Sequence, residues 1–248
     1  MKAMILAAGL GTRLRPYTNT LPKPLLPVGG TPLIVWNLLL LRQYGIHEVM
    51  INLHYLGHMI QQELGDGALW GMQLSYSQEP VILGTGGGLR EAEAFFQGED
   101  VLVLNGDTLT ELDIGEVQRV HSLSQALVTM VLRDDPHVEQ WGVVETTNDN
   151  HVLRINGQGQ CDGRHPSEIR KRMFAGVHIL NPRVLSHCPL GRYSSIIDAY
   201  VTELERGSMI MGHVHAGYWS DIGTPERYAQ AQQDVDAGRL TLASRAVR

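Results

Sequence analysis

The sequence predicts an α/β fold in which helices flank a mostly parallel sheet. Short apolar runs alternate with segments of helix-like apolar spacing through the first half of the chain. With 248 residues and 43% hydrophobic content, the chain is large enough to bury an extensive core. Strand–helix–strand alternation gives parallel strands joined by right-handed crossovers. Ligands of such sheets bind beyond the carboxyl ends of the strands, so we expect the functional residues there.

The first half contains four predicted strands and three predicted helices. The strands are Ala3–Ala7, Glu48–Asn52, Leu74–Ser77 and Val101–Leu104, and the helices are Pro32–Tyr44, Met59–Leu64 and Gly86–Phe96. A glycine-rich loop follows the first of these strands, and an acidic turn follows the fourth. Both are therefore predicted to lie at the carboxyl edge of the sheet.

The second half is predicted to be richer in strands. We expect strands at Ala126–Leu132, Gly142–Glu145, Phe174–Leu180 and Met209–His213, and a closing helix at Pro225–Gly238. The polar segment Ile155–Met173 is predicted to be a loop or insertion. Because no linker or internal repeat divides the chain, we expect one domain over residues 1–248, with a substrate-facing part from about residue 126 onward.

Charge and cysteine content narrow the class of protein. A formal net charge of −6 gives no general attraction to nucleic acid or to an anionic membrane, so neither is expected as a partner. Cys161 and Cys188 lack the spacing of metal ligands, and a disulfide between them stays an open alternative. The absence of a cysteine framework fits the reducing cytoplasm. Met1–Ala8 is apolar for too few residues to be a signal peptide or a membrane span.

The loop after the first strand has the features of a phosphate site. Gly9 and Gly11 let backbone N–H groups approach phosphate oxygens without obstruction by side chains. Arg13 can grip a phosphate through two parallel hydrogen bonds, and Lys23 supplies a compact point charge between two prolines. The Walker motif is absent, and the dinucleotide fingerprint fails because Leu14 stands where its third glycine is required.

With Gly-Leu-Gly-Thr-Arg at residues 9–13 and Pro-Lys-Pro at 22–24, the sequence closely resembles the sugar-1-phosphate nucleotidyltransferases. The resemblance covers about residues 1–236 and continues through Pro27–Leu33, Gly84–Gly87, Asn105–Asp107 and Trp219–Pro225. It implies a Rossmann-like mixed, mostly parallel sheet flanked by helices, of the nucleotide-diphospho-sugar transferase type. It also implies transfer of a nucleoside monophosphate from a nucleoside triphosphate to a sugar 1-phosphate, with release of pyrophosphate.

The same resemblance assigns the candidate site. Arg13, Lys23 and Asp107 are the implied catalytic residues, and Asp107 with Asp221 is implied to hold Mg²⁺, which takes few protein oxygen ligands. The implied nucleotide-binding residues are Leu6, Ala8, Gly9, Gly11, Thr12, Gln78, Glu79, Gly84 and Gly86, and the implied sugar-binding residues are Gly142 and Gly176. The nucleotide-binding half would be about residues 1–125 and the sugar-phosphate-binding half about 126–238, followed by a short C-terminal tail.

One departure from the family leaves the substrates open. Many relatives carry Glu-Lys-Pro after the Gly142 strand, whereas this chain has Asn-Gly-Gln-Gly-Gln at residues 156–160. We leave the charged run Arg170–Arg172 out of the site, since such runs commonly form a solvated face. The motifs lean to GTP with mannose or heptose 1-phosphate, and the alternative is UTP with N-acetylmuramate 1-phosphate or the 1-phosphate of another sugar.

Two other classes of protein stay open as alternatives. One is a catalytically silent regulatory subunit that binds a nucleotide sugar, although Arg13, Lys23, Asp107 and Asp221 are all intact. The other is a cytidylyltransferase for a non-sugar alcohol phosphate. The sequence leaves open whether the protein is a monomer or a homodimer.

Overall fold

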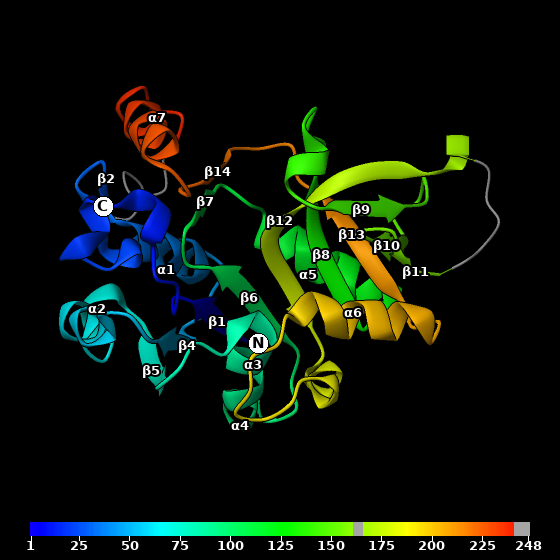
Figure 1. Ribbon diagram of the computed structural model, residues 1–248, viewed down its shortest axis with the longest axis horizontal. Helices are drawn as coiled ribbons and strands as arrows, with labels where there is room; N and C mark the ends of the chain where they lie inside the picture. Colours follow the sequence, from blue (N-terminus) through cyan, green and yellow to red (C-terminus); the bar gives the residue numbers. More distant parts are fainter. Residues whose placement is uncertain (161–165, 241–248) are drawn as a thin grey trace. The chain divides into compact units, whose positions relative to one another are not determined.

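A computed structural model describes residues 1–160 and 166–240, which form two compact units. Unit 1 contains residues 1–82, 104–112 and the segment from 217 onward, and unit 2 contains residues 83–103 and 113–216. The chain therefore enters unit 1 three times, as the colours of Figure 1 show. These units do not follow one cut in the sequence, and the division into a nucleotide half and a sugar half stays a prediction.

Unit 1 is built on a parallel sheet. Strands β1 (Lys2–Leu6), β4 (Glu48–Leu53) and β5 (Gln73–Gln78) pair in parallel, with β4 in the middle (Figure 1). Consecutive residues of β1 from Ala3 to Ile5 are fully buried, as are alternate residues of β4. Strands covered on both faces read as continuous apolar runs, which is why the sequence revealed them.

Helices connect these strands as predicted. Helix α1 (Leu33–Gln43) follows Pro32 and ends where Gly45 adopts a φ of +70° and the Ile46 amide bonds to the Leu41 carbonyl. Helix α2 (Gly57–Leu64) and the closing helix α7 (Pro225–Asp236) also confirm their predictions. The unit has four 3₁₀ turns, η1 (Thr12–Leu14), η2 (Tyr17–Asn19), η3 (Lys23–Leu25) and η4 (Ala68–Trp70). None of the described helices could span a bilayer.

Two short antiparallel pairs complete unit 1. Strand β2 (Pro27–Val28) pairs with β3 (Thr31–Pro32), and β7 (Thr108–Thr110) pairs with β14 (Trp219–Asp221). The second pair joins segments about 110 residues apart in the chain and places Asp221 opposite Thr108. Strand β6 (Val101–Asn105) begins in unit 2 and ends in unit 1, directly before this pair.

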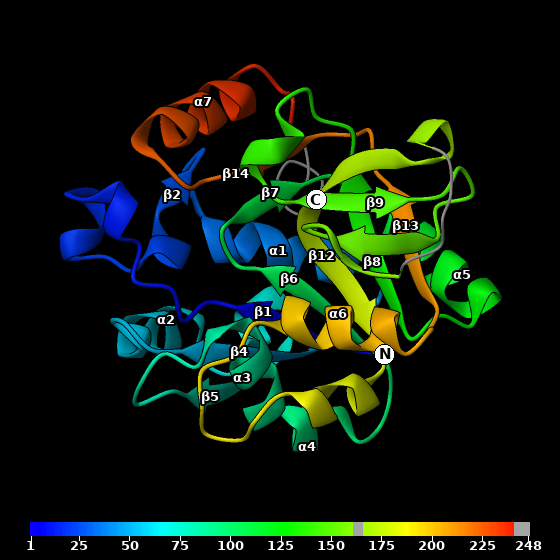
Figure 2. The same cartoon turned by 45° about the vertical axis from the view of Figure 1, so that its right-hand side comes forward.

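Unit 2 has a largely antiparallel sheet (Figure 2). Strand β12 (Arg170–Leu180) pairs with β8 (Val128–Arg133) and β9 (Val143–Thr146); the remaining strands are β10 (Val152–Ile155), β11 (Gln158–Gly159) and β13 (Ile210–Val214). The β8–β13 pair is parallel. The predicted class, α/β with a mixed sheet flanked by helices, is confirmed, and its parallel pairing is concentrated in unit 1.

Two predictions need correction, one in each half of the chain. The predicted loop Ile155–Met173 is wrong at both ends, because Ile155 pairs with Gln158 between β10 and β11, and residues 170–173 pair with β9 along its whole length. Residues 161–165 of this prediction lie outside the described part of the chain. The predicted helix Gly86–Phe96 is two helices, α3 (Gly84–Glu91) and α4 (Glu93–Phe96). The structure adds helices α5 (Ile114–Ser124) and α6 (Ile196–Glu205) and the turns η5 (Val138–Gln140), η6 (Pro166–Glu168) and η7 (Pro182–His187).

A buried aromatic cluster lies between β12 and α6 in unit 2. The His178 ring stacks on Phe174 with a 5.3 Å centroid separation, and Tyr200 packs edge-on against it at 5.6 Å. Gly176, with a φ of +75°, lies between the two stacked residues at a bulge in β12. Neither ring nitrogen of His178 has a hydrogen-bond partner among the described residues. Burial lowers the pKa of His178 to about 3.

We predict that His178 makes the protein sensitive to acid. Its folded-state pKa of about 3 lies below the ordinary 6.5, so the unfolded chain binds this proton first and stability falls as pH drops below 6.5. Between pH 7 and pH 5 this loss is on the order of 2 kcal/mol. His178→Phe should remove that part of the pH dependence in urea unfolding at the two pH values.

The matched control lies in the same cluster. Tyr200→Phe removes a buried hydroxyl without a partner among the described residues. Because burial raises the pKa of Tyr200 far above this range, the variant should keep the acid sensitivity of the wild type. An equal pH dependence in His178→Phe and wild type would contradict the prediction.

Candidate active site

A cavity of about 300 Å³ lies entirely within unit 1. It is lined by Gly9, Leu10, Gly11, Thr12, Arg13, Leu14, Lys23, Ile82, Asp107 and Gly223. The glycine loop enters it from the carboxyl end of β1, and Asp107 enters it from the turn after β6. The cavity therefore lies where an α/β sheet binds its ligands, and it holds all three predicted catalytic residues.

Lys23 and Asp107 form an ion pair at this cavity. Lys23 lies in η3 between Pro22 and Pro24 and is 8% exposed. Its Nζ donates to Oδ2 of Asp107 over 2.5 Å, although 84 residues separate the two in the chain. A buried ammonium needs such a partner, and the flanking prolines restrict the backbone that carries it. The ion pair therefore holds one cation and one carboxylate in fixed positions against the cavity.

Arg13 supplies a second cation that the protein itself does not neutralise. It lies in η1 and is exposed, and among the described residues its guanidinium has no hydrogen-bond or ion-pair partner. A methyl group added at Gly223 would come within 3.2 Å of Nη2 of Arg13 and would overlap Oδ1 of Asp221. The guanidinium thus lies beside Gly223, where it can meet an anionic ligand.

The requirement for glycine differs between positions 9 and 11 of the loop. Gly11 has a φ of +63°, and a methyl group there would lie 3.0 Å from the Thr18 methyl, so the fold itself requires glycine. Gly9 is exposed, has no positive φ and has open space around its Cα. Protein packing therefore does not explain the glycine at position 9, and its predicted contact with the nucleotide stays a prediction.

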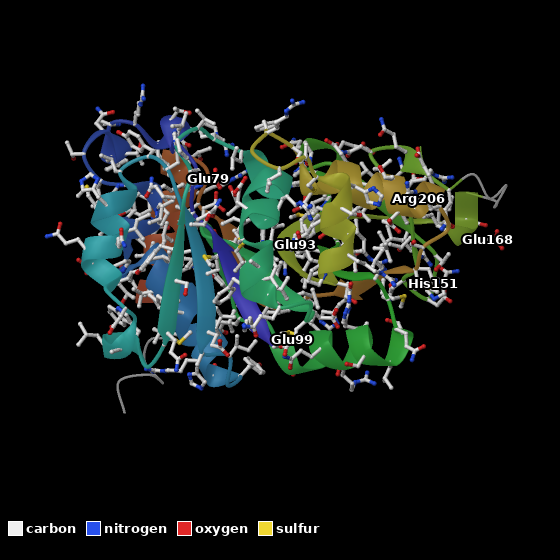
Figure 3. All side chains as sticks on the ribbon, turned by 90° about the horizontal axis from the view of Figure 1, so that it is seen from below. Glu79, Glu93, Glu99, His151, Glu168 and Arg206 are labelled. Atoms are coloured by element: carbon white, nitrogen blue, oxygen red, sulfur yellow. The ribbon has the colours of Figure 1, made fainter. Side chains whose placement is uncertain are left out.

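A buried hydrogen-bond network fixes the start of the loop. Oδ1 of Asn52 accepts a hydrogen bond from the Ala7 amide over 2.8 Å, and its Nδ2 donates to Oε1 of Glu79 over 2.7 Å. Glu79, labelled in Figure 3, follows β5 and is 1% exposed, whereas Gln78 before it is exposed. The carboxylate of Glu79 thus orients Asn52 in this structure, and its predicted contact with the nucleobase stays a prediction.

The start of the loop is also tied to the acidic turn. The Leu6 carbonyl accepts a hydrogen bond from the Gly106 amide over 2.9 Å, and a methyl group at Gly106 would lie 2.8 Å from that carbonyl oxygen. Glycine at 106 therefore permits close approach of the Asp107 turn to β1. Ala8 is nearly buried, while Thr12 is exposed at the cavity.

The predicted metal-binding aspartates come together at the same turn. The Ile222 amide donates to the Asp107 carbonyl over 3.0 Å, directly beyond the β7–β14 pair. Asp107 lines the cavity, and the Asp221 carboxylate lies against Gly223, which also lines it. Among the described residues, Oδ1 of Asp107 and Oδ2 of Asp221 have no partner. Two carboxylate oxygens are a donor set that fits Mg²⁺, which keeps several waters.

The remaining predicted nucleotide-binding glycines belong to unit 2. Gly84 and Gly86 lie in the first turn of α3, and the Gly86 amide bonds to the Ser194 carbonyl over 2.9 Å. A methyl group at Gly84 would lie 2.6 Å from that carbonyl oxygen, and one at Gly86 would lie 2.9 Å from Sγ of Cys188. Close packing thus accounts for both glycines, and their contact with a nucleobase stays a prediction.

The predicted sugar-binding glycines also lie in unit 2. Gly142 has a φ of +89° directly before β9, where the Val143 amide bonds to Oδ1 of Asn156. Gly176 lies at the bulge of β12. The cations of the 170–172 run contact Asn148, Glu139 and Asp134, respectively. These contacts pair each cation of the run with a polar side chain of the protein.

Three residues at the site were missed by the sequence analysis: Asn52, Gly223 and Arg227. Gly223 lies within the Trp219–Pro225 motif, and its lack of a side chain was the signal that could have placed it at the site. Arg227 donates to Oδ1 of Asp221 over 3.0 Å from the first turn of α7. Asn52 ends a predicted strand, and a polar residue at the carboxyl end of a buried strand is a signal of this kind.

Comparison with known proteins shows the family to which the chain belongs. The nucleotidyl transferase family profile matches residues 2–238, and the chain belongs to that family. Its predicted membership of the sugar-1-phosphate nucleotidyltransferases, enzymes that transfer a nucleotidyl group, is confirmed as well. Members of the family generally use a divalent metal ion.

Two relatives illustrate the range within the family. The N-acetylmuramate alpha-1-phosphate uridylyltransferase of Neisseria meningitidis serogroup B is 37% identical over 236 residues, which cover 94% of this chain and 97% of the relative. The mannose-1-phosphate guanylyltransferase of Mycobacterium tuberculosis is 31% identical over 238 residues, which cover 95% of this chain and 65% of the relative. The chain thus spans about two thirds of the second relative.

A solved structure confirms the fold. HddC from Yersinia pseudotuberculosis, complexed with GMP-PN, superposes with a TM-score of 0.76 at 24% identity and covers 94% of this chain and 99% of that chain.

We predict opposite effects of alanine at the two loop glycines. Gly9→Ala should change the free energy of unfolding by less than about 0.5 kcal/mol, because the position has open space. It should still lower kcat/KM by about tenfold or more if phosphate must approach the backbone there. Gly11→Ala, the control, should lose about 1–2 kcal/mol of stability through its left-handed backbone. Full activity of Gly9→Ala would remove position 9 from the site.

The two aspartates should act as a unit in activity and differ in stability. Either change to asparagine should lower kcat by at least about 100-fold, and the double variant should be scarcely worse. Asp107→Asn weakens the bond to the buried Lys23 and should cost about 1–2 kcal/mol. Asp221→Asn should cost at most about 1 kcal/mol, since Arg227 is 38% exposed. Pyrophosphate release measures the activity of each variant, and urea unfolding measures its stability. Additive losses of activity in the double variant, or full activity of the wild type in EDTA, would contradict a shared metal ion.

Proposed function

We propose that this enzyme uses Mg²⁺ to transfer a uridylyl group from UTP to N-acetylmuramate 1-phosphate, releasing pyrophosphate. The observation that supports the transfer chemistry best is the single cavity with Arg13, Lys23 and Asp107 around the glycine loop. Two cations at one cavity suit a reaction between two anions. In this proposal the exposed Arg13 contacts oxygens of the triphosphate. Lys23, which Asp107 holds in place, contacts oxygens of the phosphate group that reacts.

The chemistry asks little of the protein beyond alignment and charge neutralisation. A sugar phosphate has a second pKa of about 6 and is largely dianionic at neutral pH, so it needs no general base. Its phosphate oxygen attacks the α-phosphorus; the new O–P bond forms as the bond to the bridging oxygen breaks, and pyrophosphate leaves with the electron pair. Arg13 and Lys23 would stabilise the charge that develops on the phosphoryl oxygens.

Asp107 and Asp221 would hold the divalent cation. When bound, Mg²⁺ supplies further charge neutralisation at the phosphates. The two aspartates would contribute one carboxylate each, Asp107 from the turn before β7 and Asp221 from the end of β14, and the nucleotide phosphates with water would complete the coordination. The choice of Mg²⁺ rests on this all-oxygen, two-carboxylate donor set.

Similarity over nearly the full length supports the choice of UTP and N-acetylmuramate 1-phosphate. The uridylyltransferase relative is 37% identical over 97% of its length, whereas the guanylyltransferase relatives for mannose 1-phosphate and for a heptose 1-phosphate are 31% and 30% identical. The sequence motifs themselves lean to GTP with mannose or heptose 1-phosphate, which is therefore the second candidate. A cytoplasmic location and the oligomeric state stay predictions.

A substrate matrix tests this proposal. We expect kcat/KM for UTP with N-acetylmuramate 1-phosphate to exceed that for GTP with mannose 1-phosphate by about 100-fold, since a site that hydrogen-bonds its own base rejects another strongly. Pyrophosphate release should be measured for UTP, GTP, CTP and dTTP against four sugar 1-phosphates, with Lys23→Ala as the inactive control. Higher turnover with GTP would establish the second candidate in its place.

A further inference from the structure

The carboxylate of Asp221 already has a cation of the chain itself beside it. Nη1 of Arg227 donates to Oδ1 of Asp221 over 3.0 Å, and the Asp221 side chain is 18% exposed. Arg227 lies six residues after Asp221, in the first turn of α7, where its amide also bonds to the Thr224 hydroxyl that caps the helix. The ion pair is therefore built from a rigid helix terminus rather than from two loops.

Helix α7 is firmly attached to the rest of unit 1. The hydroxyl of Tyr228 donates to the Pro27 carbonyl over 2.7 Å, and Gln232 donates to the same carbonyl and accepts from the Gly29 amide. Figure 1 shows α7 beside β2, the strand that directly follows the Lys23 turn. Because the helix cannot easily turn away, Arg227 stays close to Asp221 whether or not a metal ion is bound.

A fixed positive charge beside a metal ligand opposes binding of a divalent cation. The guanidinium occupies one carboxylate oxygen directly, and it repels any cation held by the other oxygen. It also restricts the rotation of the carboxylate, so Oδ2 is presented in one orientation. The first two effects weaken metal binding, and the third orients the ligand.

We propose that Arg227 is a positioning residue that holds Asp221 in place and sets a weak affinity of the free enzyme for its divalent cation. Metal would then bind well only together with the nucleotide, whose phosphates outweigh the repulsion by Arg227. The proposal rests on the proposed function of Asp107 and Asp221. It adds to that function that the metal ion binds together with the nucleotide and not before it, and that Arg227, a residue outside the cavity, determines this order.

The test measures metal binding in the absence of nucleotide, using Mn²⁺ as the probe and the EPR signal of the free ion as the readout. Arg227→Gln should lower the dissociation constant of Mn²⁺ about three- to tenfold, because it removes the nearby charge. Arg227→Lys keeps a charge and should stay closer to the wild type. With UTP present, kcat of Arg227→Gln should fall because Asp221 is less well oriented, so that tighter metal binding accompanies slower turnover.

Two controls make each outcome decisive. Arg119→Gln removes a comparable surface arginine, paired with Glu116 on α5, and should leave Mn²⁺ binding unchanged. Unchanged or weaker Mn²⁺ binding by Arg227→Gln would overturn the proposal. Asp221→Asn separates this failure from that of the proposed function: wild-type Mn²⁺ binding by Asp221→Asn would show that Asp221 is not a ligand at all, and would overturn both.

Discussion

The antiparallel pairing of β14 with β7 is the constraint on which the site depends. It joins a segment near residue 220 to the turn after β6, and the bond from the Ile222 amide to the Asp107 carbonyl extends it to the catalytic turn. Without this pairing, only the attachment of α7 would hold Asp221 and Gly223 near Lys23. A few backbone hydrogen bonds thus decide whether residues more than 100 positions apart act on one ligand, and the attachment of α7 to Pro27 and Gly29 reinforces them.

Local charge, rather than net charge, suits this protein to its ligands. The chain carries a formal charge of −6, yet its cavity presents Arg13 and Lys23 to the incoming anions. Both predicted metal-binding carboxylates are paired with a cation of the chain, Asp107 with Lys23 and Asp221 with Arg227. Such pairing limits the repulsion between two carboxylates held near each other. Binding of the proposed metal ion would therefore compete with existing ion pairs, so that its affinity would depend on the two cations as well as on the aspartates.

The sequence was sufficient to predict an element where a strong signal lies within the element itself or directly beside it. Strands β1, β4 and β6 are continuous apolar runs, and the ends of α1 are marked by Pro32 and Gly45. It was insufficient for β7 and β14, which are three residues long and owe their existence to pairing across the chain. The segment from Arg170 was predicted to be a loop because of its charges, yet it pairs with β9, since strand pairing depends on backbone groups and not on side-chain polarity. Arg227 was missed because a cation on a helix is usually a surface residue.

Several glycines near the site can be divided into those that the fold requires and those that it does not. Gly11 and Gly86 are required by backbone conformation or by close packing, so their presence in a family motif does not by itself indicate contact with a substrate. Gly9 has neither requirement. At position 223, an alanine would place its methyl group against the Asp221 carboxylate. Gly106 permits the approach of the Asp107 turn to β1 and so acts indirectly. Of Gly9, Gly11, Gly86, Gly106 and Gly223, Gly9 is therefore the one that neither backbone conformation nor packing within the protein explains.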